Sequence, residues 1–308
     1  MASATSTGEA GERGQATPEY AGLVLLIATV LGAILALAGP ALPGGGVARA
    51  VASKLVCAAG GEDGCGEALA VPAAAPSPLE RAYGPELAGL LGERLPTISF
   101  EDDDFVSLPV DYRECRERAC SDSILHGSLE HTQSGLEPTV FTHVIDCRDP
   151  AAAAADGYDC SRAPAGYVYL QYWLYYPESW TRSYQRWGFH EDDWESYQVR
   201  IAPDGTIEAR ASSHHGYNGR SGGIGSIGSD LGKVPKTAWD QIADQLHVAA
   251  GSHAGMSAAQ EGDSRRIEPA DLRVIPLEPI ARGGAAPPFA VSPPWEKAVW
   301  TDPEAMGT

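Results

Sequence analysis

Basic residues are scarce in this chain of 308 residues: 22 lysines and arginines stand against 41 aspartates and glutamates, giving a net charge of −19. A protein that gathers phosphate groups by electrostatic attraction needs a basic surface, so this balance argues against binding to nucleic acid or capture by an anionic membrane surface. Residues 1–56 are neutral overall, so the whole acidic excess belongs to residues 57–308. Nucleic acid is therefore not an expected partner.

Charged residues are absent between Ala21 and Ala48. Residues 21–38 are almost wholly apolar, and as a helix they would span about 27 Å, close to the ~30 Å core of a bilayer. A buried core helix is one alternative, but a helix that is apolar on every side suits lipid better. A cleaved secretory signal is the other alternative, but the preceding segment lacks its basic region. The sequence predicts a single-pass membrane helix over 15–39, with secretion after cleavage as the alternative.

The residues before this run, Gly14-Gln15-Ala16-Thr17-Pro18-Glu19-Tyr20, resemble the leader junction of Flp/Tad-type prepilins and TadE-like pseudopilins. The resemblance implies a leader of residues 1–14 that a prepilin peptidase removes between Gly14 and Gln15. It also implies that Glu19, which is costly to place beside a membrane helix, pairs with the N-terminal amine of a neighbouring subunit. Pilin-type subunits are therefore candidate partners.

Cysteine pairs with C-x-x-C spacing are missing, which argues against structural zinc. The six cysteines all follow the apolar run and form three close pairs: Cys57/Cys65, Cys115/Cys120 and Cys147/Cys160. An even number of cysteines behind an export segment predicts disulfides, here between sequence neighbours, although six cysteines allow 15 connectivities. Disulfides need an oxidising compartment, so we expect residues 45–308 to be extracytoplasmic.

Helical patterns are rare beyond the apolar run. Residues 40–95 are rich in alanine, proline and glycine and predict a stalk with one short helix near 79–93. Residues 96–280 predict a mainly β domain, a β-sandwich, with strands at 139–145, 167–176, 194–201, 206–212 and 246–250. One helix is predicted within it, at 237–246. Residues 281–308 form a proline-rich tail that either wraps the surface or is loose.

The densest polar cluster is Gly188-Phe189-His190-Glu191-Asp192-Asp193-Trp194-Glu195. In a strand, Asp193 and Glu195 would point to one face and Trp194 to the other. Two adjacent carboxylates repel unless a proton or a cation lies between them, and oxygen ligands favour Ca²⁺ or Mg²⁺. The residue four positions after His190 is Trp194, so this is not the H-E-x-x-H zinc motif. An acidic, solvated loop is the alternative.

Two other histidine groups follow predicted strands: Ser213-His214-His215-Gly216 and Gly251-Ser252-His253-Ala254-Gly255. Loops at strand ends often carry active sites, so His190, His214 and His253 are candidate general bases, with a structural role as the alternative. The stretch Gly223–Gly228 fits G-x-G-x-x-G but lies in a Gly/Ser-rich loop, so no nucleotide cofactor is expected.

The order YLQYWLYYPES, HEDDWES, ASSHHG and VAAGSHAG over residues 165–256 resembles the vacuolar protein sorting protein 62 family. It is more distantly similar to the necrosis- and ethylene-inducing-peptide-like proteins. The resemblance implies a β-sandwich in which His190, Asp193 and Glu195 surround a divalent cation in an acidic cleft. Asp192 replaces a histidine of those relatives, and residues 179–186 contain no counterpart of their upstream aspartate.

These observations favour a membrane-anchored surface protein whose acidic domain binds an envelope or external ligand, such as a glycan or a lipid head group, through Ca²⁺ or Mg²⁺. Binding is favoured over catalysis. A metal-assisted hydrolase and a minor pilin-like structural subunit are the alternatives.

Overall fold

The structure is a computed structural model, and it describes residues 75–101, 105–124, 132–183, 186–213, 216–217, 239–240, 244–258, 265–279 and 288–305. The predictions that concern Gly14, Gln15, Glu19, Cys57 and Cys65 lie outside these residues, as does the predicted membrane helix. Within the described ranges, no helix is long and apolar enough to cross a membrane. Pro76–Thr308 is a compact unit that contains every described core residue. We therefore expect this unit to fold on its own.

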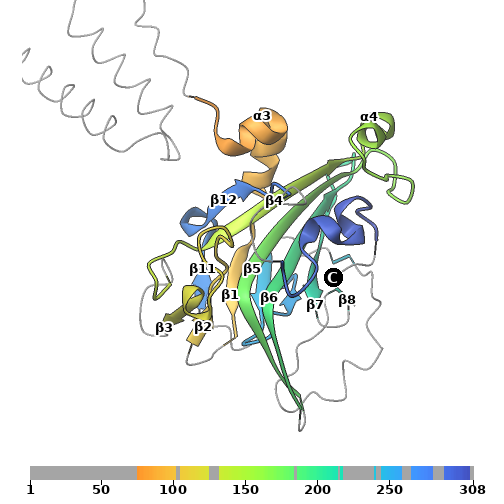
Figure 1. The fold of residues 1–308 in the computed structure, drawn as a ribbon. Coiled ribbons are helices and arrows are strands. Elements are labelled where there is room, and N and C mark those ends of the chain that lie inside the picture. The colour runs from red at the N-terminus through yellow and green to blue at the C-terminus, as the bar shows by residue number, and fades with distance from the viewer. Residues whose placement is uncertain are drawn as a thin grey trace, which may run out of the picture. The chain divides into compact units, whose positions relative to one another are not determined.

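The described chain is mainly β, with two larger sheets and few helices (Figure 1). The six-stranded sheet runs, in order, β12 (Arg273–Pro276), β4 (Thr139–Asp146), β5 (Val168–Ser183), β6 (Arg186–Ile201), β7 (Ile207–Ser213) and β8 (Gly216–Tyr217). The four-stranded sheet runs β10 (Gly255–Met256), β9 (Gln245–Val248), β1 (Thr97–Phe100) and β11 (Arg265–Ile267). A two-stranded sheet pairs β2 (Phe105–Ser107) with β3 (Asp122–Ile124). The β1–β9 and β12–β4 pairs are parallel, and the other strand pairs are antiparallel.

All five predicted strands are present, and β5 and β6 are much longer than predicted. The prediction of a helix at 237–246 is wrong. Asp240 forms a β-bridge with Ala209, and Gln245–Val248 is strand β9. Residues Leu246 and Val248 are buried between the sheets, so the burial gained by pairing β9 with β1 outweighs the local helical preference.

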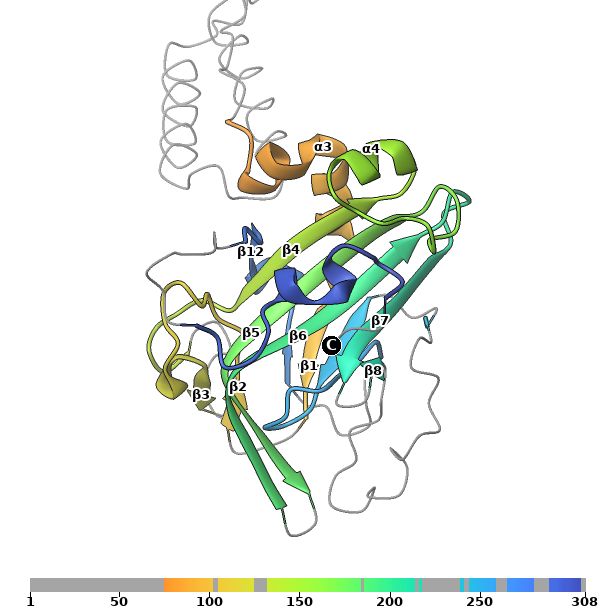
Figure 2. The ribbon, with the colours of Figure 1, turned by 45° about the vertical axis from the view of Figure 1, so that its right-hand side comes forward.

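The two faces of the six-stranded sheet are covered by different parts of the chain. One face packs on the four-stranded sheet, and the core between them includes Leu170, Tyr172 and Tyr197 from the large sheet and Ile98 and Leu246 from the small one. On the other face, the aromatic side chains of β5 and β6 pack with the C-terminal segment, through Val299, Trp300 and Ala305. In Figure 2 that segment, with its short helices η4 (Pro294–Glu296) and η5 (Ala298–Trp300), crosses in front of these strands.

The predicted helix near 79–93 is confirmed as α3 (Pro78–Glu93). Its first turn is closed by a capping box between Ser77 and Glu80. Its last turn reaches the core, because Leu91 is fully buried and its carbonyl accepts a 2.8 Å hydrogen bond from the Tyr172 hydroxyl. This helix therefore packs with the β domain, and the compact unit begins before the boundary predicted at residue 96.

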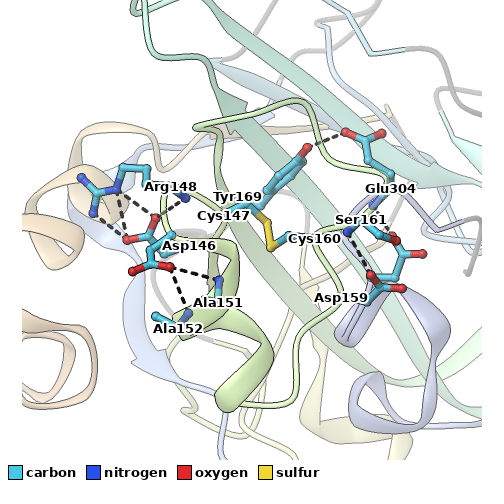
Figure 3. Close-up of a disulfide and its surroundings, with 12 residues drawn as sticks. Asp146, Cys147, Arg148, Ala151, Ala152, Asp159, Cys160, Ser161, Tyr169 and Glu304 are labelled. Carbon is cyan, nitrogen blue, oxygen red and sulfur yellow. Dashed lines mark hydrogen bonds and ion pairs between the residues drawn. A yellow bond between two sulfur atoms is a disulfide. The ribbon is translucent and has the colours of Figure 1, made fainter.

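Two of the predicted disulfides are present, Cys115–Cys120 and Cys147–Cys160. Cys120 closes the short helix η2 (Arg118–Cys120), and Cys147 follows directly after β4. Figure 3 shows the second bond beside helix α4 (Pro150–Ala155), whose N-terminus is capped by the Asp149 carboxylate at the amides of Ala151 and Ala152. The bond therefore joins the loop after α4 to the end of a central strand.

Removing these bonds should destabilise the fold by amounts that follow loop length. The Cys147→Ser/Cys160→Ser variant should lose about 3 kcal/mol of unfolding free energy, and Cys115→Ser/Cys120→Ser about 2 kcal/mol, because the longer loop gains more entropy in the unfolded chain. Urea unfolding with and without reductant measures both. Equal stability of wild type and both variants would contradict disulfide formation.

His143 on β4 is a buried histidine that packs against the C-terminal segment. Its ring stacks on Trp300 with centroids 3.6 Å apart, Nδ1 lies 3.1 Å from Gln171 Oε1, and Nε2 lies 3.1 Å from the Tyr158 hydroxyl. Gln171 Oε1 also accepts from Trp173 Nε1, so Nδ1 of His143 is the donor and Nε2 the acceptor of a neutral ring. Burial lowers the pKa of His143 to about 4, which agrees with that assignment.

Acid should therefore unfold the protein partly through His143. The unfolded chain binds this proton near pH 6.5 and the folded chain only near pH 4, so stability is lost as pH falls through that window. The full effect is about 3 kcal/mol. His143→Gln should flatten the pH dependence of urea unfolding between pH 6.5 and 4 relative to the wild type. An equally steep dependence in His143→Gln and in the wild type would contradict this role.

Candidate functional site

The alternation predicted for Asp193, Trp194 and Glu195 is confirmed. In the β5–β6 pairing, Asp193 lies opposite Tyr176 and Glu195 opposite Leu174, both of which face the core between the two sheets. Trp194 lies on the other face, where its ring packs with Tyr112 and Phe289. Asp193 is buried and Glu195 is half-buried, so the two carboxylates belong to a strand and not to a solvated loop.

His253 meets Asp193 from the other sheet. It lies in the short connection between β9 and β10, and its Nδ1 is 2.8 Å from Asp193 Oδ2. Its ring stacks on Tyr176 with centroids 3.8 Å apart and an interplanar angle of 6°. The side chain is only 3% exposed. Asp193 and Tyr176 together fix both the position and the orientation of the imidazole.

Two buried polar atoms at this place have no hydrogen-bond partner among the described residues: Nε2 of His253 and the hydroxyl of Tyr176. Leaving a buried donor or acceptor unpaired costs about 1–3 kcal/mol, so each such atom needs an explanation. Because the two rings are stacked, the unpaired atoms belong to one location. A water molecule or a ligand at this location would supply the missing partners.

The connection that carries His253 is held by several backbone contacts. The Trp180 amide donates to the Gly251 carbonyl at 2.7 Å, and the His253 amide donates to the Ala249 carbonyl at 3.1 Å. The Ala250 amide donates to the Glu101 carboxylate at 2.9 Å. His253 itself has a left-handed backbone, with φ of 53°, which is unusual outside glycine. The histidine is thus presented by a tight turn that is fixed at several points.

A small, shallow pocket that is partly open to solvent adjoins this turn. Its wall includes His253, Gly251, Glu101 and Ser107, together with apolar residues of β1, β2 and β9. Acidic charge therefore lies on the pocket wall at Glu101 and behind His253 at Asp193. The sequence did not indicate that Glu101 and His253 share one pocket.

The carboxylates of Asp193 and Glu195, which lie behind His253, are shielded from solvent. Burial, aided by repulsion from Asp193, raises the pKa of Glu195 well above its usual range. The Ser212 hydroxyl donates to the Glu195 carboxylate, which partly offsets this rise. Lys297, whose ammonium lies 3.3 Å from the Trp194 carbonyl, has its pKa lowered by burial. A proton or a cation near Glu195 would relieve the repulsion between the two carboxylates.

His190 does not join Asp193 and Glu195. Its side chain is exposed and its Nδ1 lies 2.9 Å from the Asp192 carbonyl. Among the residues described, no group of three or more His, Cys, Asp or Glu side chains is arranged to hold a metal ion. The predicted set of His190, Asp193 and Glu195 is therefore brought together only in part, and His214 lies outside the described residues.

Asp192, between these residues, has a structural role that the sequence did not reveal. Its carboxylate accepts from Arg116 at 2.6 Å, from the Tyr175 hydroxyl at 2.7 Å and from the Ala290 amide at 2.7 Å. It thus joins β6 to the segment before η2 and to the C-terminal segment. The Asp193–His253 contact was not predicted either. The two residues are 60 positions apart, and a local sequence pattern does not indicate contacts between residues so far apart in the chain. The Gly-Ser-His-Ala stretch was the one available signal.

The chain matches no protein-family model, no curated protein and no solved structure. The function of the site must therefore be inferred from its own geometry.

Gly251 should be essential for the turn that presents His253. Its φ is +69°, and an added Cβ would lie 2.9 Å from the Trp180 carbonyl oxygen, so alanine brings both backbone strain and a clash. Gly251→Ala should cost roughly 3 kcal/mol of unfolding free energy, from strain and overpacking together.

Gly205→Ala is the matched control, because Gly205 has a φ of +85° but an open space where a Cβ would lie. It should lose only about 1 kcal/mol. Urea unfolding of the two variants measures the difference, and equal losses would show that the close approach to Trp180 does not constrain the turn.

Proposed function

We propose that this chain is a membrane-anchored, extracytoplasmic protein whose mainly β domain is a β-sandwich that binds an envelope or external ligand at the His253 pocket. One observation carries the proposal: His253 Nε2 is buried without a partner among the described residues, while Nδ1 is fixed by Asp193. A ring nitrogen held in this way at a pocket wall is supplied with a partner when a ligand enters.

A divalent cation is the second part of the proposal. Asp193 and Glu195 are the carboxylates that would hold Ca²⁺ or Mg²⁺, which prefer oxygen ligands, and His253 would orient Asp193. The raised pKa of Glu195 supports this, since a bound cation would offset the repulsion from Asp193. Glu101 and Asp193 make the surroundings of His253 acidic, so an anionic glycan or a lipid head group that enters this pocket would need such a cation as a bridge.

Calorimetric titration of Ca²⁺ and Mg²⁺ into the Pro76–Thr308 unit tests both parts. Asp193→Asn, Glu195→Gln and His253→Asn should each weaken binding at least about tenfold, a loss of about 1.4 kcal/mol. Asparagine is chosen for His253 because it tolerates a left-handed backbone. His190→Ala should bind like the wild type.

The outcomes separate the hypotheses. Absence of saturable binding would remove the cation from the proposal. Loss of binding in His190→Ala with retention in His253→Asn would favour the set predicted from the sequence, His190, Asp193 and Glu195, over the His253 pocket. Circular dichroism of each variant reports whether the fold is retained.

A hydrolase is the second candidate, and the Asp193–His253 contact favours it. A carboxylate that fixes one imidazole nitrogen and leaves the other free is the arrangement of a general base. Turnover of esters or phosphodiesters that disappears in His253→Asn would support this candidate. The minor-pilin hypothesis and processing at Gly14 rest on residues outside the described ranges and stay predictions.

A further inference from the structure

We propose that the Cys115–Cys120 disulfide is a redox switch that controls how firmly His253 is held at its pocket. This inference concerns the regulation of that site and therefore rests on the function proposed above for the pocket. The bond closes a short loop, because its cysteines are 5 residues apart in the sequence. The loop carries Arg116 and Arg118, and each of them binds a carboxylate near the interruption of the β5–β6 pairing.

Arg116 holds the residue next to Asp193. Its guanidinium forms a 2.6 Å ion pair with the carboxylate of Asp192, which is buried. Asp192 has a left-handed backbone, and such a conformation persists only where the surrounding contacts enforce it. The next residue, Asp193, accepts or donates the hydrogen bond that fixes Nδ1 of His253. Loss of the Arg116 contact would therefore let this part of β6 relax at the point where it holds the histidine.

Arg118 is connected to the turn that presents His253. It forms a 2.8 Å ion pair with Glu178, and its guanidinium lies 5.5 Å from the centroid of the Trp180 ring. The Trp180 indole nitrogen donates to Glu178 Oε1 at 3.0 Å, so the three side chains form one cluster. The Trp180 amide in turn donates to the Gly251 carbonyl at 2.7 Å. The loop between the cysteines thus supports the turn through Trp180.

The residues that follow Cys120 lead to the pocket wall. The Ser121 carbonyl accepts a 2.8 Å hydrogen bond from the Leu108 amide, and strand β3 then pairs with β2. Val106 and Ser107 of β2 line the pocket. The closed loop is therefore connected to the pocket through β2 as well as through its two arginines.

The two disulfides differ in their access to a reductant. Cys115 is half-buried, whereas Cys120 is only 1% exposed, so an incoming thiolate would attack the sulfur of Cys115. Cys120 would then be the leaving thiolate, and its sulfur accepts a 3.2 Å hydrogen bond from the Glu117 amide. A hydrogen bond of this kind stabilises a thiolate, and a better leaving group speeds the exchange. Cys147 and Cys160 are both buried, which protects the second bond.

The switching reaction is a thiol–disulfide exchange with a dithiol. The first thiolate of the dithiol bonds to the Cys115 sulfur, and the electron pair of the broken S–S bond goes to Cys120, which takes up a proton. The second thiol of the reductant then displaces the Cys115 thiolate, which is also protonated, and the reductant leaves as a disulfide. Two electrons and two protons thus pass to the protein. The opened loop gains conformational freedom, which weakens the hold of both arginines.

Graded reduction of the full chain with dithiothreitol tests the chemistry. Alkylation and peptide mass mapping after each step report which cysteines have become free. Cys115 and Cys120 should be alkylated at a dithiothreitol concentration at least about tenfold lower than Cys147 and Cys160. Reduction of both bonds together, or of Cys147–Cys160 first, would overturn the inference.

Hydrogen exchange tests the structural link in the same selectively reduced protein. The amides of Trp180 and His253 are hydrogen-bonded to carbonyls of the turn, and reduction should speed their exchange at least about tenfold. In the oxidised protein, Arg118→Gln should also speed it, because Arg118 binds Glu178 at the surface. The control Arg148→Gln removes another exposed arginine that forms ion pairs and should leave it unchanged. Unchanged exchange on reduction would overturn the inference.

Calorimetric titration of Ca²⁺ separates the switch from the proposed function. Reduction of Cys115–Cys120 should weaken Ca²⁺ binding about tenfold, and reoxidation should restore it. Equal Ca²⁺ binding by the oxidised and the reduced protein would overturn the switch. Absence of Ca²⁺ binding in both states would count against the proposed cation alone, because the exchange of the His253 turn is measured without any ligand.

Discussion

The antiparallel pairing of β5 with β6 is the interaction on which the rest of the structure depends. Its fixed register decides which face each residue of the polar cluster occupies, because a shift by one residue would exchange the two faces of the sheet. With this register, Asp193 and Glu195 lie between the sheets and Trp194 lies under the C-terminal segment. One ladder thus positions both the carboxylates between the sheets and the aromatic side chains beneath the C-terminal segment.

The interruption of this ladder is as important as its continuity. Pro177, which has no amide hydrogen, lies opposite Asp192 between the pairs Tyr176–Asp193 and Glu178–Glu191. Asp192 has a left-handed backbone, with φ of 54°, and its carboxylate is bound by Arg116, Tyr175 and Ala290. These contacts supply several charge-assisted hydrogen bonds that can offset the backbone strain. They also fix the C-terminal segment over the aromatic face, so the described part of the proline-rich tail, residues 288–305, is part of the fold.

The sequence reveals what is encoded locally. Short runs of aromatic and β-branched residues predicted the strands, and side-chain alternation predicted the opposite faces of Asp193 and Trp194. Cysteine spacing predicted Cys115–Cys120 and Cys147–Cys160. It does not reveal contacts between distant segments. The Asp193–His253 contact depends on how the two sheets pack. A strand was predicted at 246–250, but its pairing with β1 and β10 was not. The structural role of Asp192 was missed for the same reason, since its partners lie far away in the sequence.

The site combines features that reduce stability, which argues for a functional origin. An imidazole nitrogen and a tyrosine hydroxyl that have no partner among the described residues each cost free energy in the folded state, as does the buried carboxylate of Asp193 beside the half-buried Glu195. Apolar residues of similar size would fill the same space without these costs. The surrounding structure tolerates them because the turn at Gly251 and the stacked ring of Tyr176 hold His253 firmly against Asp193. A ligand or cation that paired these groups would recover part of that cost, so binding at this place should also stabilise the fold.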